Sequence, residues 1–440
     1  MTTLDLRDTP VSMTDPTALD LLEQAIRQFQ SYVGDPVATI EPALEARPDF
    51  ALGHAMRAAA LISFGEQRFF DQARPSVAAL EALVERGVAN DRERALGAAL
   101  RKLVDGDWNA ASVLFDRALV ANPRDVIALQ TAHLFDFVRG DALNLRNRIS
   151  RVLPAWSAST PGYSYVLGFY AFGLEECNQY DAALATANKA LELEPADAWA
   201  VHAGLHCMEM QGQIDQGMQW LESKKPQWSV NGFAFHNHWH LALLHLDRGE
   251  IARVLEIFDR DILAEDTDIA FVLVDASALL WRLHLLGIDV ASRMARLANL
   301  WEAKLDGERG FYAFNDVHAM LAFAAVGREA SMARILHDLE SAAVGSTTNA
   351  MMSRDVGLPL ARGVAAFGTG RYAQCLDELE PVRDIAYRFG GSHAQRDLIT
   401  LTIIEAARRC GKLQLARHYL NERVMHRPGS ELGTRLLARM

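Results

Sequence analysis

The segment DGDWNAASVLFDRALVANPRD, residues 105–125, decides the fold class of this 440-residue chain. Its apolar residues follow Gly106 at helical spacing, and Pro123 ends the helix because proline cannot continue one. The same order of turn, small, apolar and proline residues returns in NQYDAALATANKALELEPAD, residues 178–197. Alanines at matching sites in both segments let neighbouring helices approach closely. We therefore predict a repeated unit of helix, turn and helix.

This unit resembles the tetratricopeptide repeat, whose consensus period is about 34 residues. Ten glycine or asparagine residues mark the turn between the two helices of successive units: Gly65, Gly106, Gly140, Asn178, Gly212, Gly249, Gly287, Gly327, Gly370 and Gly411. The steps between them run from 34 to 43 residues, so several connections between units must be enlarged. Strand patterns are nearly absent. We predict an all-α fold, an α-solenoid of about ten helix pairs in a right-handed superhelix, with a tail at residues 1–15 and a single solenoid at 16–440.

Charge and composition exclude several classes of function. The chain carries 44 Lys and Arg against 56 Asp and Glu, a formal charge of −12, which disfavours binding to nucleic acid or to an anionic membrane. No apolar run reaches the roughly 18 residues that span a membrane, and the N-terminus lacks the apolar core of a secretory signal. The four cysteines show no CxxC spacing, so neither a disulfide framework nor a thiolate zinc site is indicated. We expect a cytoplasmic protein.

Four segments depart from the repeat pattern and are predicted to be loops: 153–164, 223–235, 305–314 and 344–359. The first three contain or adjoin aromatic residues, among them Trp156, Trp228 and Phe311. Such loops could pack over one edge of the superhelix and close its groove into a pocket, or they could only cap the exposed edges of repeats. The sequence leaves both possibilities open.

Histidines concentrate on the helices that we expect to come first in each pair. Nine of the 14 histidines lie there: His54, His133, His202, His206, His236, His238, His240, His284 and His318. In tetratricopeptide repeats the first helix lines the inner surface of the superhelix, so many of these side chains are expected to face the groove.

Two neighbouring units hold the densest group. His202, His206 and Glu209 share one helical face because they lie at positions i, i+4 and i+7. In the next unit, His236 and His240 form another i, i+4 pair, with Trp239 beside them. Further polar candidates lie at the start of other inner helices: His54, Asp275, Asp316 and His318.

Three chemistries fit this group. A divalent metal could bind to His202, His206, His236 and His240. His206, Glu209 and His240 could act as catalytic acid, base and orienting carboxylate near neutral pH. The polar side chains could instead hold a ligand without reaction, and the candidates for ligand binding are His54, His202, His236, Trp239, Asp275, Asp316, His318, Arg354 and Arg396. The alternative to all three is that the histidines are hydrogen-bonded packing residues.

Two arginine and aspartate pairs occur near the C-terminus, Arg354 with Asp355 and Arg396 with Asp397, at predicted helix starts. The arginines could clamp a ligand carboxylate. Alternatively, the aspartates cap helices and the arginines lie on the surface.

Six segments together resemble the tetratricopeptide repeat protein 38 family, here a bacterial member: GHAM at 53–56, DAWAVHAGLHCMEM at 197–210, HNHWH at 236–240, FNDVH at 314–318, RDVGLPL at 354–360 and GGSHAQRD at 390–397. The resemblance covers almost the whole chain and implies a long solenoid. It adds weight to eight residues as a site: His202, His206, Glu209, His236, Trp239, His240, Asp316 and His318. It implies no particular reaction.

Two functions remain open. The first is a binding protein that holds a peptide, a protein or a small molecule in its groove, as such arrays commonly do. The second is an enzyme of hydrolase type that acts on a small molecule, assisted by a divalent metal or by histidine and carboxylate side chains.

Overall fold

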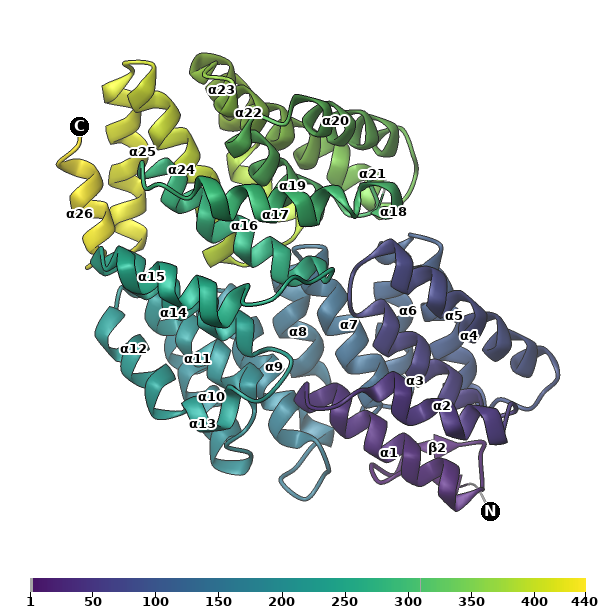
Figure 1. Ribbon diagram of the computed structural model, residues 1–440. Helices are drawn as coiled ribbons and strands as arrows, with labels where there is room; N and C mark the ends of the chain where they lie inside the picture. The colour runs from purple at the N-terminus through teal and green to yellow at the C-terminus, as the bar shows by residue number, and fades with distance from the viewer. Residues whose placement is uncertain (1–2, 309) are drawn as a thin grey trace. The chain divides into compact units, whose positions relative to one another are not determined.

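The computed structural model describes residues 3–308 and 310–440, and these residues form an all-α protein (Figure 1). Within the described residues only two short strands occur, β1 (Thr3–Leu4) and β2 (Pro10–Val11). None of the described helices combines the length and the apolar character that crossing a membrane requires. The predicted fold class is confirmed.

The helices gather into two compact units. The first comprises residues 3–204 with 226–233, and the second comprises 205–225 with 234–440. The division falls inside α11 (Ala198–Met210) and inside the short helix α13 (Lys225–Trp228).

The first unit is a run of helices in which consecutive members pack on each other, for example α3 on α4 and α9 on α10. Besides the parts of α11 and α13, its helical elements are α1 (Pro16–Ser31), α2 (Pro36–Ala46), α3 (Ala51–Ile62), α4 (Gln67–Glu85), α5 (Asp91–Val104), α6 (Trp108–Ala121), α7 (Val126–Val138), α8 (Ala142–Val152), the 3₁₀ turn η1 (Leu153–Ala155), α9 (Tyr163–Glu176) and α10 (Tyr180–Leu193).

The second unit continues the pattern with more irregular connections. Its elements are α12 (Ile214–Ser223), α14 (Ala234–Arg248), α15 (Ile251–Ile257), η2 (Phe258–Ile262), α16 (Ala270–Leu285), α17 (Ala291–Glu302), α18 (Leu305–Glu308), α19 (Ala313–Val326), α20 (Glu329–Ala343), α21 (Thr348–Met352), η3 (Ser353–Gly357), α22 (Leu358–Gly368), α23 (Tyr372–Leu379), η4 (Glu380–Phe389), α24 (His393–Arg409), α25 (Leu413–His426) and α26 (Glu431–Leu437).

All ten predicted turn residues adopt the left-handed backbone conformation, with φ between 60° and 81°. Nine are glycines, which reach this conformation without steric cost, and the tenth is Asn178, one of the few other residue types that tolerate it. The alanines of the repeat pattern are buried in the same register, among them Ala111, Ala118, Ala183 and Ala190. The helix pairs therefore follow the register that the sequence predicts.

Two segments differ from expectation. Residues 3–15, predicted as part of a tail, include the β1–β2 hairpin, where the buried Arg7 bonds to Glu23 at 2.6 Å. Residues 344–359, predicted as a loop, are mostly helical because α21, η3 and α22 follow one another without a break. Residues 1, 2 and 309, which belong to the predicted tail and to the loop at 305–314, lie outside the described residues.

Candidate functional site

Three histidines meet in the second unit where the end of α11 faces α14. Nε2 of His206 lies 3.1 Å from Nε2 of His240, although 34 residues separate them in the sequence. His236 lies one turn before His240 on α14, and the centroids of their rings are 4.9 Å apart. We call His206, His236 and His240 the histidine centre.

A carboxylate orients each of the two histidines that α14 contributes to the centre, His236 and His240. His240 Nδ1 lies 2.8 Å from Oε2 of Glu209, on α11. His236 Nδ1 lies 2.6 Å from Oδ2 of Asp275, on α16. When Nδ1–H of each ring donates to its carboxylate, Nε2 carries the lone pair of a neutral imidazole. A carboxylate thus fixes the orientation of each of these two rings.

The histidine centre is buried. His206 and His240 have no exposed surface, and His236 and Glu209 are each 4% exposed. Burial, reinforced by the neighbouring His206 and His236, lowers the pKa of His240 well below its usual value. Burial raises the pKa of Asp275, whereas its contact with His236 opposes that shift. This burial favours the neutral form of the His240 imidazole at physiological pH.

Trp239 forms one wall of this region and is fully buried. Its ring stacks on His236 with centroids 5.4 Å apart and an interplanar angle of 12°. The guanidinium of Arg282, from α16, lies 5.5 Å from the Trp239 ring centroid. Arg282 also donates to the carbonyl of Ala394 at 2.6 Å, and burial lowers the pKa of Arg282 to about 10.

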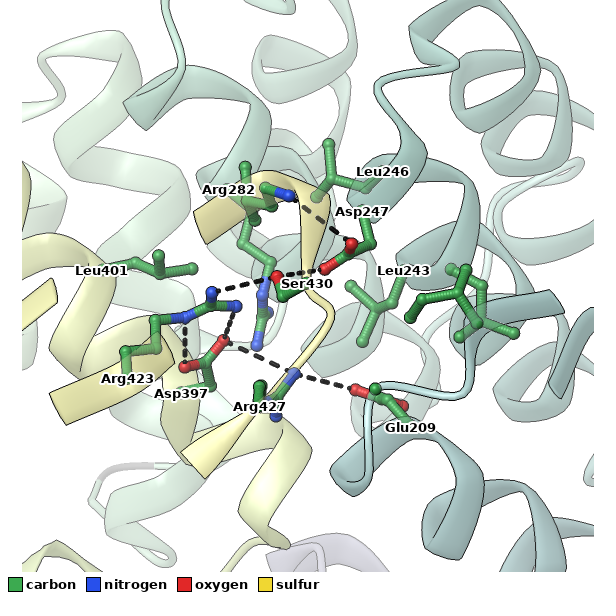
Figure 2. A pocket seen from close by; sticks show the side chains of 14 residues that line it. Glu209, Leu243, Leu246, Asp247, Arg282, Asp397, Leu401, Arg423, Arg427 and Ser430 are labelled. Atoms are coloured by element: carbon green, nitrogen blue, oxygen red, sulfur yellow. Dashed lines mark hydrogen bonds and ion pairs between the residues drawn. The ribbon is translucent and has the colours of Figure 1, made fainter. Parts of the chain in front are cut away.

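Next to the histidine centre lies a small charged cavity of about 20 Å³, enough for roughly one water molecule. Figure 2 shows Arg427 reaching Glu209 on one side and Asp397 on the other. Arg423 makes a two-pronged ion pair with Asp397 at 2.9 and 3.0 Å. These arginines hold the pKa of Asp397 well below its usual range, although burial alone would raise it. Glu209 therefore connects this cavity to the histidine centre.

Asp316 and His318, on α19, make other contacts. Nδ1 of His318 lies 2.7 Å from the carbonyl of Phe314 in its own helix, and burial lowers its pKa to about 4. Burial raises the pKa of Asp316 far above its usual value, and the nearby carboxylates of Glu308 and Asp338 add to this effect. Both side chains are buried, but no described hydrogen bond links either of them to the histidine centre.

Two other predicted residues lie in the first unit. The ring of His202 packs against Phe172, Trp199 and Phe233 with centroid distances of 5.2 to 5.3 Å. His54 lies on α3, where its Nε2 is 3.0 Å from the carbonyl of Pro48.

The two arginines that were predicted to clamp a ligand carboxylate, Arg354 and Arg396, have different contacts. Arg354 is 56% exposed and pairs with its neighbour Asp355, inside η3 and not at a helix start as predicted. Arg396 donates to the carbonyl of Gly391 and to His393. Three other arginines, Arg282, Arg423 and Arg427, line the cavity shown in Figure 2, and the sequence patterns did not identify them. The i, i+4 spacing of the last two was the available signal.

No family model matches the chain. Similar solved structures include yeast Tom70, with 13% identity, 90% of this chain and 88% of that chain covered, and a TM-score of 0.43. A human IFIT1 dimer with PPP-AAAA shows 12% identity, coverage of 98% and 95%, and a TM-score of 0.42. The TPR domain of P58(IPK) shows 14% identity, coverage of 90% and 99%, and a TM-score of 0.23.

The fold is of the tetratricopeptide-repeat type. The ten left-handed turns and the consecutive packed helices establish this from the chain itself. Similarity at the level of these solved structures says nothing about function.

Proposed function

We propose that this chain is a helical-repeat binding protein whose binding site is the histidine centre and whose ligand is small, no more than a few atoms across. The burial of the site carries this proposal. His206 and His240 are fully buried and His236 nearly so. An extended peptide needs an open groove with accessible side chains, and this centre offers none to it.

Burial of this many polar groups also argues for a binding role. Moving imidazole and carboxylate groups out of water costs free energy unless each finds a partner. Here His236, His240 and Glu209 are held in specific hydrogen bonds that aim ring nitrogens at one point. A purely structural core could fill the same volume with apolar side chains at lower cost.

A second candidate function is hydrolysis of an amide or ester. The observation that favours it is the Glu209–His240 pair, in which a carboxylate orients an imidazole as it does for a general base. His206, Glu209 and His240 would then be the catalytic residues, with a water molecule as nucleophile. Turnover of a panel of small amides and esters, lost in His240→Ala, would distinguish this function from binding alone.

Two broader predictions from the sequence, the extent of the solenoid and the family, are also part of the proposal. We propose a single solenoid over residues 16–440 and membership of the tetratricopeptide repeat protein 38 family, on the strength of the segments quoted above. His202, Asp316 and His318 are proposed as outlying contributors to ligand binding, and His54, Arg354 and Arg396 as weaker ones.

Native mass spectrometry of the purified protein tests the main proposal. We expect a bound mass above that of the bare chain, or a rise in melting temperature with one member of a small-ligand panel. Both signals should disappear in His206→Ala and His240→Ala. His133→Ala is the matched control, since it removes a buried histidine from the first unit, and it should retain them. A bare mass and no thermal shift, together with a specific hit on a peptide array, would overturn the proposal.

A further inference from the structure

We propose that His206, His236 and His240 coordinate a divalent transition-metal cation of the zinc class. This inference rests on the proposed function, because it takes the histidine centre to be the binding site and names the chemical class of the ligand.

The distances suit a common metal ion. One ring nitrogen from each of the three histidines lies within 4.8 Å of the others, and the His206 and His240 Nε2 atoms are 3.1 Å apart. In a tetrahedral site with Zn–N bonds of about 2.0–2.1 Å, two ligand nitrogens lie about 3.3 Å apart. An ion can therefore fit between these rings with small rotations of the side chains.

The Nδ1 atoms of His236 and His240 make the kind of hydrogen bond that metal-binding histidines make. A histidine that binds metal through Nε2 almost always donates its Nδ1–H to a carboxylate, a carbonyl or water. His240 meets Glu209 in this way and His236 meets Asp275. Two carboxylates from two different helices, α11 and α16, thus fix two rings on α14 in the orientation that coordination needs.

The type of donor selects the class of metal. Three imidazoles favour Zn²⁺, Co²⁺, Ni²⁺ or Cu²⁺, whereas Mg²⁺ and Ca²⁺ prefer oxygen ligands. The carboxylates supply compensating charge without serving as ligands.

The charge around the centre is compatible with a cation. Four carboxylates, Glu209, Asp247, Asp275 and Asp397, stand against three arginines, Arg282, Arg423 and Arg427. Arg423 and Arg427 are engaged with Asp397 and Glu209, and Arg282 donates to backbone carbonyls of α16 and α24. Among these seven residues of the second unit, the carboxylates outnumber the arginines by one, which favours a cation over an anion.

The competing explanation is a packing cluster, in which His206 Nε2–H simply donates to His240 Nε2. That arrangement satisfies one hydrogen bond and needs no ion. It predicts no metal affinity, whereas coordination predicts one equivalent, so metal titration separates the two.

The full-length protein should be stripped with a chelator and titrated with Zn²⁺ and Co²⁺ in competition with a chromophoric chelator. We expect one equivalent of either metal, and a Co²⁺ visible spectrum of tetrahedral intensity. His206→Gln and His240→Gln should weaken Zn²⁺ binding at least 100-fold. Glu209→Gln, which keeps the size of the side chain but not its charge, should weaken it by about 10- to 100-fold.

His245→Gln is the matched control, because it removes a buried histidine of the second unit that lies outside the centre, and it should bind as wild type does. Circular dichroism verifies that each variant is folded. If the histidine variants do not fold, the metal affinity of Glu209→Gln tests the inference in their place. No equivalent of metal, or wild-type affinity in all the centre variants, would overturn the inference. A bound organic molecule without metal would overturn the metal inference and leave the proposed function in place. If the protein bound neither a metal nor an organic molecule, both the inference and the proposed function would be overturned.

Discussion

Glu209 holds two partners at once: its Oε2 lies 2.8 Å from Nδ1 of His240 and its Oε1 lies 3.2 Å from a guanidinium nitrogen of Arg427. One carboxylate on α11 thereby ties the histidine centre to the C-terminal helices α24 and α25, since Arg427 also approaches Asp397. Orientation of the metal-binding ring and packing of the C-terminus depend on the same side chain.

Replacing Glu209 by alanine should therefore destabilise the protein strongly. The change leaves the buried Arg427 with one carboxylate fewer and His240 without its acceptor, and breaking a buried pair of this kind costs about 3–5 kcal/mol. Urea unfolding in the presence of a chelator measures this cost without any contribution from metal. Glu250→Ala is the control, because Glu250 pairs with His245 but is 43% exposed, and it should cost under about 1 kcal/mol. Equal losses in the two variants would contradict the role given to Glu209.

Asp197, just before α11, should make stability depend on pH. It is fully buried, and burial raises its pKa to about 7, although the backbone N–H groups of Ala200 and Trp199 oppose the shift. Between about pH 4 and pH 7 the folded protein then keeps a proton that the unfolded chain has released. Stability should fall as pH rises through this window, by up to about 4 kcal/mol, and level off above it.

Denaturant titrations from pH 4 to pH 8 measure this slope. Asp197→Asn cannot ionise and should flatten the profile relative to wild type in that window. A variant profile parallel to the wild-type profile would show that Asp197 does not titrate in the predicted range.

Gly173, in α9, packs against α8 more closely than any side chain permits. A Cβ atom at this position would lie 2.5 Å from the backbone of Leu145 and Arg146. Gly173→Ala should thus destabilise the first unit by about 1–3 kcal/mol through forced separation of the two helices. Gly97→Ala is the control. Its Cβ would lie 3.2 Å from Cγ and Cδ2 of the Leu80 side chain and near no backbone, so it should cost less than Gly173→Ala, and the better helix propensity of alanine offsets part of the cost. A smaller loss for Gly173→Ala than for Gly97→Ala in thermal melts would contradict the packing.

The sequence predicted the repeat well because each turn can be recognised from the residue types at the turn itself. A left-handed residue such as Gly106 or Asn178 follows an amphipathic helix, and every one of the ten markers has the expected conformation. The loop at 344–359 was predicted wrongly for an equally local reason. Gly357 and Pro359 are residue types that commonly interrupt a helix. In the structure the π-helical turn η3 joins α21 directly to α22, and Pro359 lies in the first turn of α22, where its missing N–H is tolerated.

The candidate site was only partly predictable. Spacing placed His206 near Glu209 on one helix and His236 near His240 on the next, because neighbours within a helix follow from its period. Pairing Glu209 with Arg427 requires knowing how helices 218 residues apart pack, and no local pattern carries that information. Asp316 and His318 share the composition of the site but make their described contacts elsewhere.

The most direct test of the central claim is an anomalous difference map from crystals of the full-length protein grown with Zn²⁺, recorded at the zinc absorption edge. Metal binding at the histidine centre predicts one strong peak within bonding distance of the ring nitrogens of His206, His236 and His240, and its loss in His206→Gln. A map without a peak at the centre, or with zinc only on surface residues, would contradict the claim.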